Sequence, residues 1–249
     1  MKRFGLIGYP IEHSLSPQLF EAAYPHADMS YDLIEADNIE RAIEIFKDGY
    51  QAVNVTAPFK IEAYKFADTA DRLASALKAT NLLVKEAGSI KAYNTDCLAV
   101  MAILDRIDPG RSAKVTVAGC GGAGKAAALA SATCGHPTTI VNRSLDKAAE
   151  FCKTIGGVSA LPEETLKEAV RNSEIFIYTL PVAIKQLDEI SFRNKTIIEA
   201  NYKDPCLADR EAQEYISGLQ WLIEQAVAGF PVMTSIMPDR QRLSECCNK

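Results

Sequence analysis

Short apolar runs separated by amphipathic stretches recur along the whole chain, and this pattern predicts its strands and helices. The apolar runs predict strands at residues 4–7, 31–36, 52–55, 81–84, 89–92, 115–118, 138–144, 175–178, 196–199 and 218–222. The amphipathic or alanine-rich stretches predict helices from about residues 17 and 59, and at 39–47, 96–106, 126–133, 163–171, 223–230 and 239–247. Strands that alternate with helices of this length indicate an α/β fold with mostly parallel sheets.

Two features divide this pattern. The strands at 81–84 and 89–92 are joined by the turn EAGS, so we expect them to form an antiparallel pair at the edge of a first sheet. Residues 107–114 (IDPGRSAK) give the clearest linker signal in the chain, and a second α/β unit starts directly after them. A length of 249 residues allows two modest domains, and the two C-terminal helices could belong to either half.

Composition restricts the location and partners of the protein. A net charge of −5 argues against nucleic-acid or anionic-membrane binding, so an anionic ligand needs clustered cations. No apolar run approaches the roughly 20 residues of a membrane span, and the N-terminus reads as a strand rather than a signal peptide, so we expect a cytoplasmic protein. Seven cysteines without a C-x-x-C pair or a histidine at metal spacing indicate reduced thiols and no metal.

A glycine-rich motif follows the strand at 115–118. Gly119, Gly121 and Gly124 have the spacing G-x-G-x-x-G, and a helix-forming stretch and another strand come next. Such a strand–glycine turn–helix–strand unit suits the binding of a dinucleotide, because the turn aims a helix N-terminus at the pyrophosphate. A tight turn in some other α/β domain is the alternative interpretation.

The end of the next strand indicates which dinucleotide is bound. A site for NAD usually carries an acidic residue there, whereas this chain has Asn142, Arg143 and Ser144, followed by Lys147. Two cations and a hydroxyl suit the 2′-phosphate of NADP, since each charge-assisted hydrogen bond contributes about 1.5–3 kcal/mol. Alternatively, the two cations are solvated surface charges.

Other candidate residues lie at predicted strand ends. Ser14 and Ser16 are two residues apart, so their hydroxyls could face the same ligand, although Ser16 before Pro17 also suits a helix N-cap. Lys60 in NVTAPFK (54–60) could act as an acid/base, or be a surface lysine that opens a helix. Asp96 in AYNTD (92–96) could orient that lysine, or be an ordinary N-cap.

Taken in order, HSLSP, NVTAPFK, KATN, AYNTD, GCGGAGK, NRS and WLIEQA resemble the shikimate dehydrogenase family over residues 5–230. The resemblance implies an α/β fold with two domains. A substrate domain with a mostly parallel sheet would comprise residues 1–97 and 222–249, and a Rossmann-type NADP-binding domain residues 98–221. It implies reversible NADPH-dependent reduction of 3-dehydroshikimate to shikimate, in the biosynthesis of chorismate and aromatic amino acids. Small molecules would be the only partners of a monomer or homodimer.

The resemblance also assigns roles to residues. It implies an acid/base pair of Lys60 and Asp96. Substrate contacts are implied for Ser14, Ser16, Thr56, Asn81, Tyr202 and Gln225. Contacts with NADP are implied for Gly119, Cys120, Gly121, Gly122, Ala123, Asn142, Arg143, Ser144, Lys147, Ala200 and Gly218.

The chain departs from the family pattern in three places. Residues 178–184 read YTLPVAI where the family often has N-A-T-P-x-G-M, so an asparagine and a glycine are lost near the cofactor. Cys97 and Ala99 replace glycines after N-T-D, and Glu199 replaces an aspartate. These changes leave two rival hypotheses open: a quinate/shikimate dehydrogenase that uses NAD, and a non-catalytic protein that binds shikimate.

Overall fold

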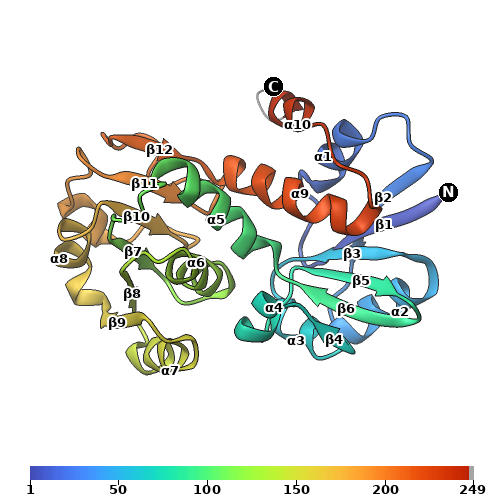
Figure 1. Ribbon diagram of the computed structural model, residues 1–249, viewed down its shortest axis with the longest axis horizontal. Coiled ribbons are helices and arrows are strands. Elements are labelled where there is room, and N and C mark those ends of the chain that lie inside the picture. The colour runs from blue at the N-terminus through green and yellow to red at the C-terminus, as the bar shows by residue number, and fades with distance from the viewer. Residues whose placement is uncertain (247–249) are drawn as a thin grey trace. The chain divides into compact units, whose positions relative to one another are not determined.

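The computed structural model describes residues 1–246, and the chain divides into two compact units. One unit contains residues 1–95 and the chain from Gln225 onward, and the other contains residues 96–224. Each unit has its own six-stranded sheet (Figure 1). The segment 107–114, predicted as a linker, is the end of α5 and a loop within the second unit, and the chain passes between the units inside two helices instead.

The first unit has the strand order β2-β1-β3-β5-β6-β4. Its strands are β1 (Lys2–Gly8), β2 (Met29–Glu35), β3 (Ala52–Val55), β4 (Thr69–Ala70), β5 (Leu82–Glu86) and β6 (Ser89–Tyr93). Its helices are α1 (Ser16–Ala23), α2 (Ile39–Gly49), α3 (Lys60–Tyr64), α4 (Arg72–Leu77) and α10 (Arg240–Cys246). The strands β1, β2 and β3 are parallel, whereas β5 is antiparallel to both of its neighbours.

The predicted antiparallel pair exists, but it does not lie at the edge of the sheet. The two-residue strand β4 pairs with β6 and forms the edge. Asp68, which precedes β4, fixes this strand to β6, because its side chain accepts a hydrogen bond from the Ile90 amide at 2.7 Å. Neither β4 nor α4 was predicted, since a two-residue strand and a six-residue helix carry little periodicity.

Helices cover both faces of the first sheet. On one face, α2 buries Ile39, Ala42, Ile43 and Phe46, a spacing that places them on one side of a helix. The Asn38 side chain caps this helix by accepting a hydrogen bond from the Arg41 amide. On the other face, the ring of Phe20 in α1 packs edge-to-face against the ring of Phe230, with ring centres 5.2 Å apart.

The second unit has the strand order β12-β11-β10-β7-β8-β9. Its strands are β7 (Val115–Ala118), β8 (Thr138–Asn142), β9 (Val158–Pro162), β10 (Ile175–Tyr178), β11 (Thr196–Glu199) and β12 (Glu214–Ile216). Its helices are α6 (Gly122–Thr133), α7 (Leu145–Ile155), α8 (Leu166–Arg171) and the 3-10 turns η1 (Glu163–Thr165) and η2 (Lys185–Glu189). Helices α5 (Thr95–Ile107) and α9 (Gly218–Thr234) each contribute to both units.

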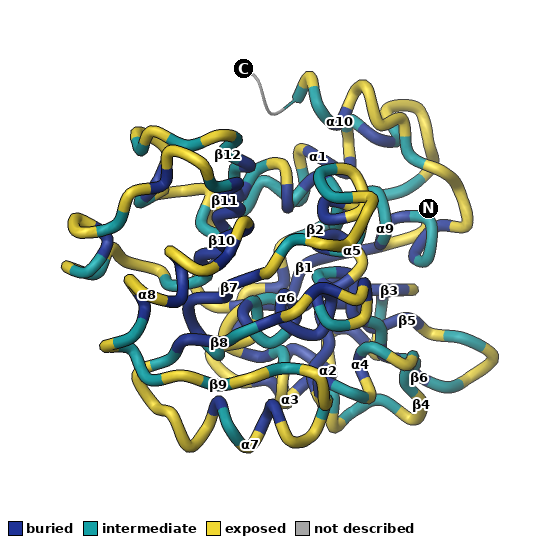
Figure 2. Tube along the Cα trace, turned by 60° about the vertical axis from the view of Figure 1, so that its left-hand side comes forward, coloured by how far each residue is buried: buried dark blue, intermediate teal, exposed yellow. Residues whose placement is uncertain are grey.

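All pairs in the second sheet are parallel, and the chain leaves the central strand β7 first on one side and then on the other. This order confirms the predicted Rossmann-type arrangement, and the reversal between β7 and β10 is where such sheets bind ligands. The strands beside the reversal are buried on both faces (Figure 2). One of the two faces packs Phe176 and Tyr178 against Val170 of α8.

The prediction of a strand at 218–222 is wrong. The last strand lies at 214–216, and residue 218 begins α9, which continues to Thr234 with Pro231 in its interior. The apolar run from Leu219 to Ile223 is therefore part of a helix. A run this short does not distinguish the 3.6-residue period of a helix from the two-residue period of a strand.

The predicted C-terminal helix is found at 240–246, and Cys247, included in that prediction, lies outside the described residues. The six cysteines within residues 1–246 are free thiols. No helix in this part of the chain is long and apolar enough to cross a membrane.

Candidate functional site

The glycine-rich turn of the second unit joins β7 to α6. Gly119 has φ +100°, a conformation that favours glycine, and a Cβ at Gly124 would lie 2.2 Å from the Gly119 carbonyl oxygen. These two glycines therefore allow the turn and the helix to touch. A Cβ at Gly121 would meet no atom within 4 Å, so this glycine faces open space. Such a division of roles is typical of a dinucleotide turn, where the middle glycine leaves room for the pyrophosphate.

The start of α6 can hold an anion. The helix has twelve residues and no side chain caps its N-terminus, so the amides of its first turn, which include Gly122 and Ala123, point out of the helix. The Cys120 amide differs, because it donates a hydrogen bond to the Asn142 side-chain oxygen at 3.1 Å. The Cys120 amide would therefore have to give up this hydrogen bond before it could donate to an anion.

Asn142 joins the ends of two neighbouring strands. Its oxygen accepts from Cys120 after β7, and its nitrogen donates to the Ser144 carbonyl oxygen at 2.9 Å. The side chain therefore fixes the turn that carries Arg143. Arg143, Ser144 and Lys147 are exposed, and within residues 1–246 neither cation takes part in an ion pair. Two cations without an ion pair among these residues are therefore available beside this turn, with Asp146 as a neighbouring carboxylate.

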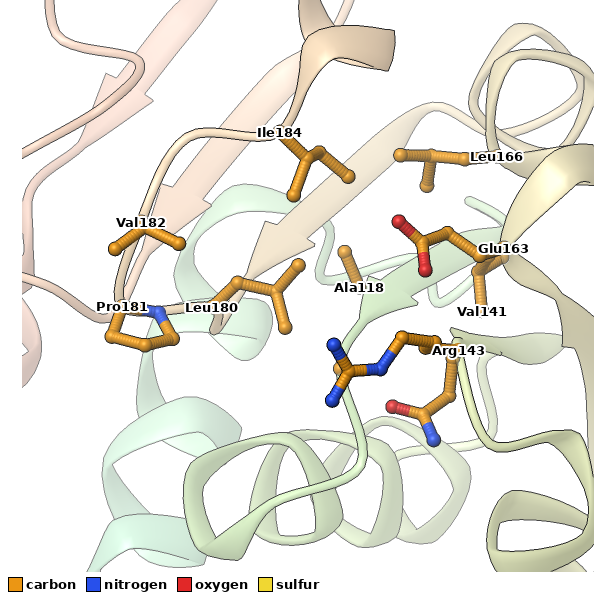
Figure 3. A pocket seen from close by; sticks show the side chains of 11 residues that line it. Ala118, Val141, Arg143, Glu163, Leu166, Leu180, Pro181, Val182 and Ile184 are labelled. Atoms are coloured by element: carbon orange, nitrogen blue, oxygen red, sulfur yellow. The ribbon is translucent and has the colours of Figure 1, made fainter.

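A pocket of about 300 Å³ adjoins this turn (Figure 3). We call it the Arg143 pocket. Its walls come from the ends of β7 and β8, the segment after β9 and the segment after β10; it is lined by Ala118, Gly119, Val141, Asn142, Arg143, Glu163, Leu166, Leu180, Pro181, Val182 and Ile184. The pocket thus lies at the reversal point of the sheet, and its size is at the lower end of the range for small-molecule sites.

Sequence patterns did not identify most of these lining residues. Glu163 and Leu166 follow β9, a half-exposed strand that the apolar pattern did not predict. The available signal was topological: the third strand of a dinucleotide-binding unit should also end beside the ligand.

The unusual segment 178–184 keeps a defined shape. The Tyr178 hydroxyl donates to the Val182 carbonyl oxygen at 2.6 Å, and the Thr179 hydroxyl donates to the Ala118 carbonyl oxygen at 2.7 Å. Burial raises the pKa of Tyr178, so the phenol stays protonated and remains a donor. These two bonds hold the segment that carries Leu180 and Pro181 against β7.

Ala200 and Gly218 are brought together after β11 and β12, at the same carboxyl edge of the second sheet as the glycine-rich turn. A Cβ at Gly218 would lie 2.7 Å from the Ala200 carbonyl oxygen and 2.7 Å from the Tyr202 amide nitrogen. Close packing of two backbone segments therefore requires glycine at 218. Tyr202 lies nearby with 37% of its surface exposed.

In the first unit, Ser14 and Ser16 do lie side by side, with their hydroxyl oxygens 3.1 Å apart. The N-cap interpretation of Ser16 is wrong, because α1 begins at Ser16 and Leu15 occupies the cap position. The Ser14 hydroxyl instead accepts a hydrogen bond from the Ser16 amide. Ser16 also hydrogen-bonds to the half-buried Tyr31, whose own hydroxyl donates to Asn54 at 2.8 Å.

Asn81 connects this network to α5. Its side-chain oxygen accepts from the Thr95 amide at 2.7 Å, and its side-chain nitrogen donates to the Thr95 hydroxyl at 2.8 Å. Asn54 in turn donates to the Asn81 carbonyl oxygen. Asp96 is not an N-cap, because α5 begins at Thr95 and places Asp96 in its first turn.

Lys60 is the first residue of α3 and is half-buried. Its carbonyl oxygen accepts from the Thr80 amide at 2.8 Å, which places it beside the residue preceding Asn81. Thr56 is also half-buried and follows β3. Gln225 is near Thr95, since a Cβ at Gly229 would lie within 4 Å of both side chains.

These residues share one edge of the first sheet. The parallel strands β1 and β3 end there, followed by Ser14 and Thr56 respectively. The antiparallel strand β5 begins there after Asn81, and β6 ends there before Thr95. The candidate substrate residues of this unit therefore converge at the edge where α/β sheets bind ligands.

A family model and a relative of known name both match this chain. Residues 6–83 match the model of the shikimate dehydrogenase substrate binding domain. The NADP(+) shikimate dehydrogenase of Dehalococcoides mccartyi strain CBDB1 is 31% identical over 259 residues, covering 93% of this chain and 90% of the relative.

Solved structures extend the comparison. A shikimate dehydrogenase in complex with NADP+ is 26% identical with a TM-score of 0.87, over 100% of this chain and 95% of the other. The quinate dehydrogenase of Corynebacterium glutamicum, in complex with NAD, shares the fold with a TM-score of 0.85 at 20% identity, over 98% of both chains.

Proposed function

The chain belongs to the shikimate dehydrogenase family, and from that membership we propose that it reduces 3-dehydroshikimate reversibly to shikimate with NADPH. Residues 1–97 and 222–249 would form the substrate domain, and residues 98–221 the NADP domain. The observation that carries the proposal is the convergence of Ser14, Thr56, Lys60 and Asn81 at one sheet edge. The reaction would belong to chorismate and aromatic amino-acid biosynthesis in the cytoplasm, with small molecules as partners of a monomer or homodimer.

The second unit would hold the cofactor. The open space at Gly121 and the uncapped start of α6 fit a pyrophosphate, and the exposed cations Arg143 and Lys147 fit a 2′-phosphate. Ala200 and Gly218 would lie near the nicotinamide. When bound, NADPH supplies the hydride that reduces the ketone carbon of the substrate.

Lys60 would supply the proton. As the ketone carbon gains the hydride, its oxygen becomes negative, and the Lys60 ammonium donates a proton to form the hydroxyl. Lys60 is left as a neutral amine and regains a proton from water before the next turnover. Asp96 would act with Lys60 by orienting the ammonium.

The remaining polar groups would bind the substrate. Ser14 and Ser16 present adjacent hydroxyls, and Ser14 would exchange its hydrogen bond to Ser16 for one to a carboxylate. Asn81 would contact a ring hydroxyl, although Thr95 already occupies its side-chain atoms, so its spare hydrogen-bonding capacity is small. Thr56, Tyr202 and Gln225 would complete the site.

NADP is favoured over NAD because the end of β8 carries no carboxylate and leaves Arg143 unpaired within the described chain. A quinate/shikimate dehydrogenase that uses NAD is the second candidate within this enzyme class. A non-catalytic shikimate-binding protein is the third candidate. The fold alone does not separate them, since a quinate dehydrogenase shares it.

One assay separates the three. Purified protein is mixed with shikimate or quinate and with NADP+ or NAD+, and absorbance at 340 nm is followed. We expect the fastest increase with shikimate and NADP+. Faster reduction of NAD+ with quinate supports the second candidate, and shikimate binding without any absorbance change supports the third.

A further inference from the structure

The Arg143 pocket combines a mainly apolar wall with two charged side chains. Leu166, Leu180 and Ile184 make much of its wall apolar, whereas Arg143 and Glu163 are its only charged lining residues within the described chain. A ligand that fits should therefore have a flat or compact apolar body, an anionic group and a hydrogen-bond donor. Adenosine 2′-phosphate has all three, in its purine ring, its phosphate and its exocyclic amino group.

Glu163 is placed to accept a hydrogen bond inside this pocket. It follows β9 directly and is half-buried, and Figure 3 shows its carboxylate lying between Leu166 and Arg143. One carboxylate oxygen accepts a long hydrogen bond of 3.4 Å from the Gln186 side chain. The other oxygen has no hydrogen-bond partner among residues 1–246. Gln186 thus orients the carboxylate and leaves one oxygen available.

We propose that Glu163 accepts a hydrogen bond from the exocyclic amino group of the adenine ring and so selects adenine over 6-oxopurines. This inference rests on the proposed function, because it concerns the same dinucleotide. A carboxylate repels phosphate, so the phosphate belongs at Arg143 and the neutral ring belongs at Glu163. The apolar residues Leu166, Leu180 and Ile184 suit the faces of the ring, which gain little from polar contacts.

A 6-oxopurine reverses the polarity at this position. Hypoxanthine carries a carbonyl oxygen where adenine carries an amino group, and two acceptor oxygens facing each other lose the hydrogen bond and repel. A hydrogen bond to a charged acceptor is worth enough to change affinity by about 10-fold or more. Glutamine at 163 could donate to that carbonyl, so the preference should then disappear.

The test compares two dinucleotides by direct binding. NADP+ and nicotinamide hypoxanthine dinucleotide phosphate are titrated into the full-length protein and into Glu163→Gln, and dissociation constants are measured by calorimetry. We expect the wild type to prefer NADP+ by about 10-fold or more, and Glu163→Gln to reduce this ratio to about 3-fold or less. Glu164→Gln is the matched control, because this neighbouring carboxylate is exposed and does not line the pocket; it should keep the wild-type ratio.

Two further measurements make the outcomes distinguishable. Thermal unfolding of Glu163→Gln within about 2 °C of the wild type excludes misfolding, and turnover of shikimate with each dinucleotide tests the enzyme itself. Equal binding of both dinucleotides by an active wild-type enzyme overturns the role of Glu163 and leaves the proposed function intact. Binding of neither dinucleotide, with no turnover, overturns both.

Discussion

At the scale of single residues, several side chains expected to contact ligands also hold the backbone together. Asn142 links the end of β7 to the end of β8, and Asn81 links the start of β5 to the start of α5. A substitution at either position would disturb the fold and the proposed site together. Arg143 is a better residue for testing function, because its side chain is exposed and makes no hydrogen bond or ion pair within residues 1–246.

Replacing Lys60 with alanine should reduce kcat by at least about 10²-fold, because the proton donor is lost. The helix start should survive, since it is the Lys60 carbonyl that bonds to Thr80. Steady-state kinetics checks kcat, and calorimetry checks that shikimate still binds. Lys65→Ala is the control on the exposed end of the same helix. An unchanged kcat for Lys60→Ala would show that another group supplies the proton.

Replacing Arg143 with aspartate should weaken NADP+ binding about 10- to 100-fold, because a hydrogen bond to the 2′-phosphate is exchanged for repulsion. Binding of NAD+, which lacks that phosphate, should change much less. Dissociation constants for both cofactors measure the difference. Arg193→Asp makes the same charge change at an exposed position and should affect neither cofactor. Equal losses for NADP+ and NAD+ would place the 2′-phosphate elsewhere.

At the scale of elements, the turn between β7 and α6 shows how one short motif serves folding and binding through different residues. Gly119 and Gly124 permit close contact between the turn and the helix, whereas Gly121 lies beside open space. The sequence spacing alone does not separate these roles. The structure separates them, because it shows at which glycine an added Cβ would collide with a neighbouring atom.

Two matched alanine substitutions should separate stability from binding. Gly124→Ala places a Cβ against the Gly119 carbonyl oxygen and should lower the free energy of unfolding by about 1–3 kcal/mol. Gly121→Ala should leave the free energy of unfolding within about 1 kcal/mol of the wild type, because nothing lies within 4 Å and its φ of −79° suits alanine. It should nevertheless weaken NADP+ binding by obstructing the pyrophosphate.

Urea unfolding and NADP+ titration of both variants provide the check. If Gly121→Ala binds NADP+ as tightly as the wild type, the pyrophosphate does not approach this glycine.

At the scale of the whole molecule, tyrosine hydroxyls donate hydrogen bonds to other residues in both units. Tyr31 donates to Asn54 in the first unit, while Tyr178 donates to Val182 and Tyr215 to the buried Glu199 in the second. Burial raises the pKa of all three phenols, and for Tyr215 the bond to Glu199 raises the pKa further. Each folded unit therefore favours protonated phenols.

This distribution predicts that the protein loses stability in alkali. Above about pH 10 the unfolded chain releases its tyrosine protons while the folded chain retains these three. The unfolded state then binds fewer protons, so the free energy of unfolding falls as pH rises from about 10 towards the folded-state pKa. The slope contributed by each phenol is at most about 1.4 kcal/mol per pH unit.

Urea unfolding at pH 8 and pH 11 measures this loss. Tyr215→Phe should show a smaller loss between the two pH values than the wild type, because one of the three phenols is absent. An equal loss in both proteins would show that Tyr215 does not contribute.

Local patterns along the chain were sufficient to predict part of this protein. Alternating apolar runs and amphipathic stretches gave the α/β class and most strands, including β3, β10 and β11 with their observed bounds. Ordered motifs indicated the family and the cofactor class, because the glycines at 119–124 and the residues at 142–147 are each a local pattern. The errors arose where the pattern was short, as at 218–222 and at β4.

Contacts between residues far apart in the sequence became known from the folded chain. Ser14, Asn54, Asn81 and Thr95 form one network because parallel and antiparallel strands bring their ends to the same sheet edge. Glu163 enters the Arg143 pocket because the third strand of the second unit ends beside the first two. Such contacts depend on strand order and side-chain burial, and neither is encoded in the spacing of residues along the chain.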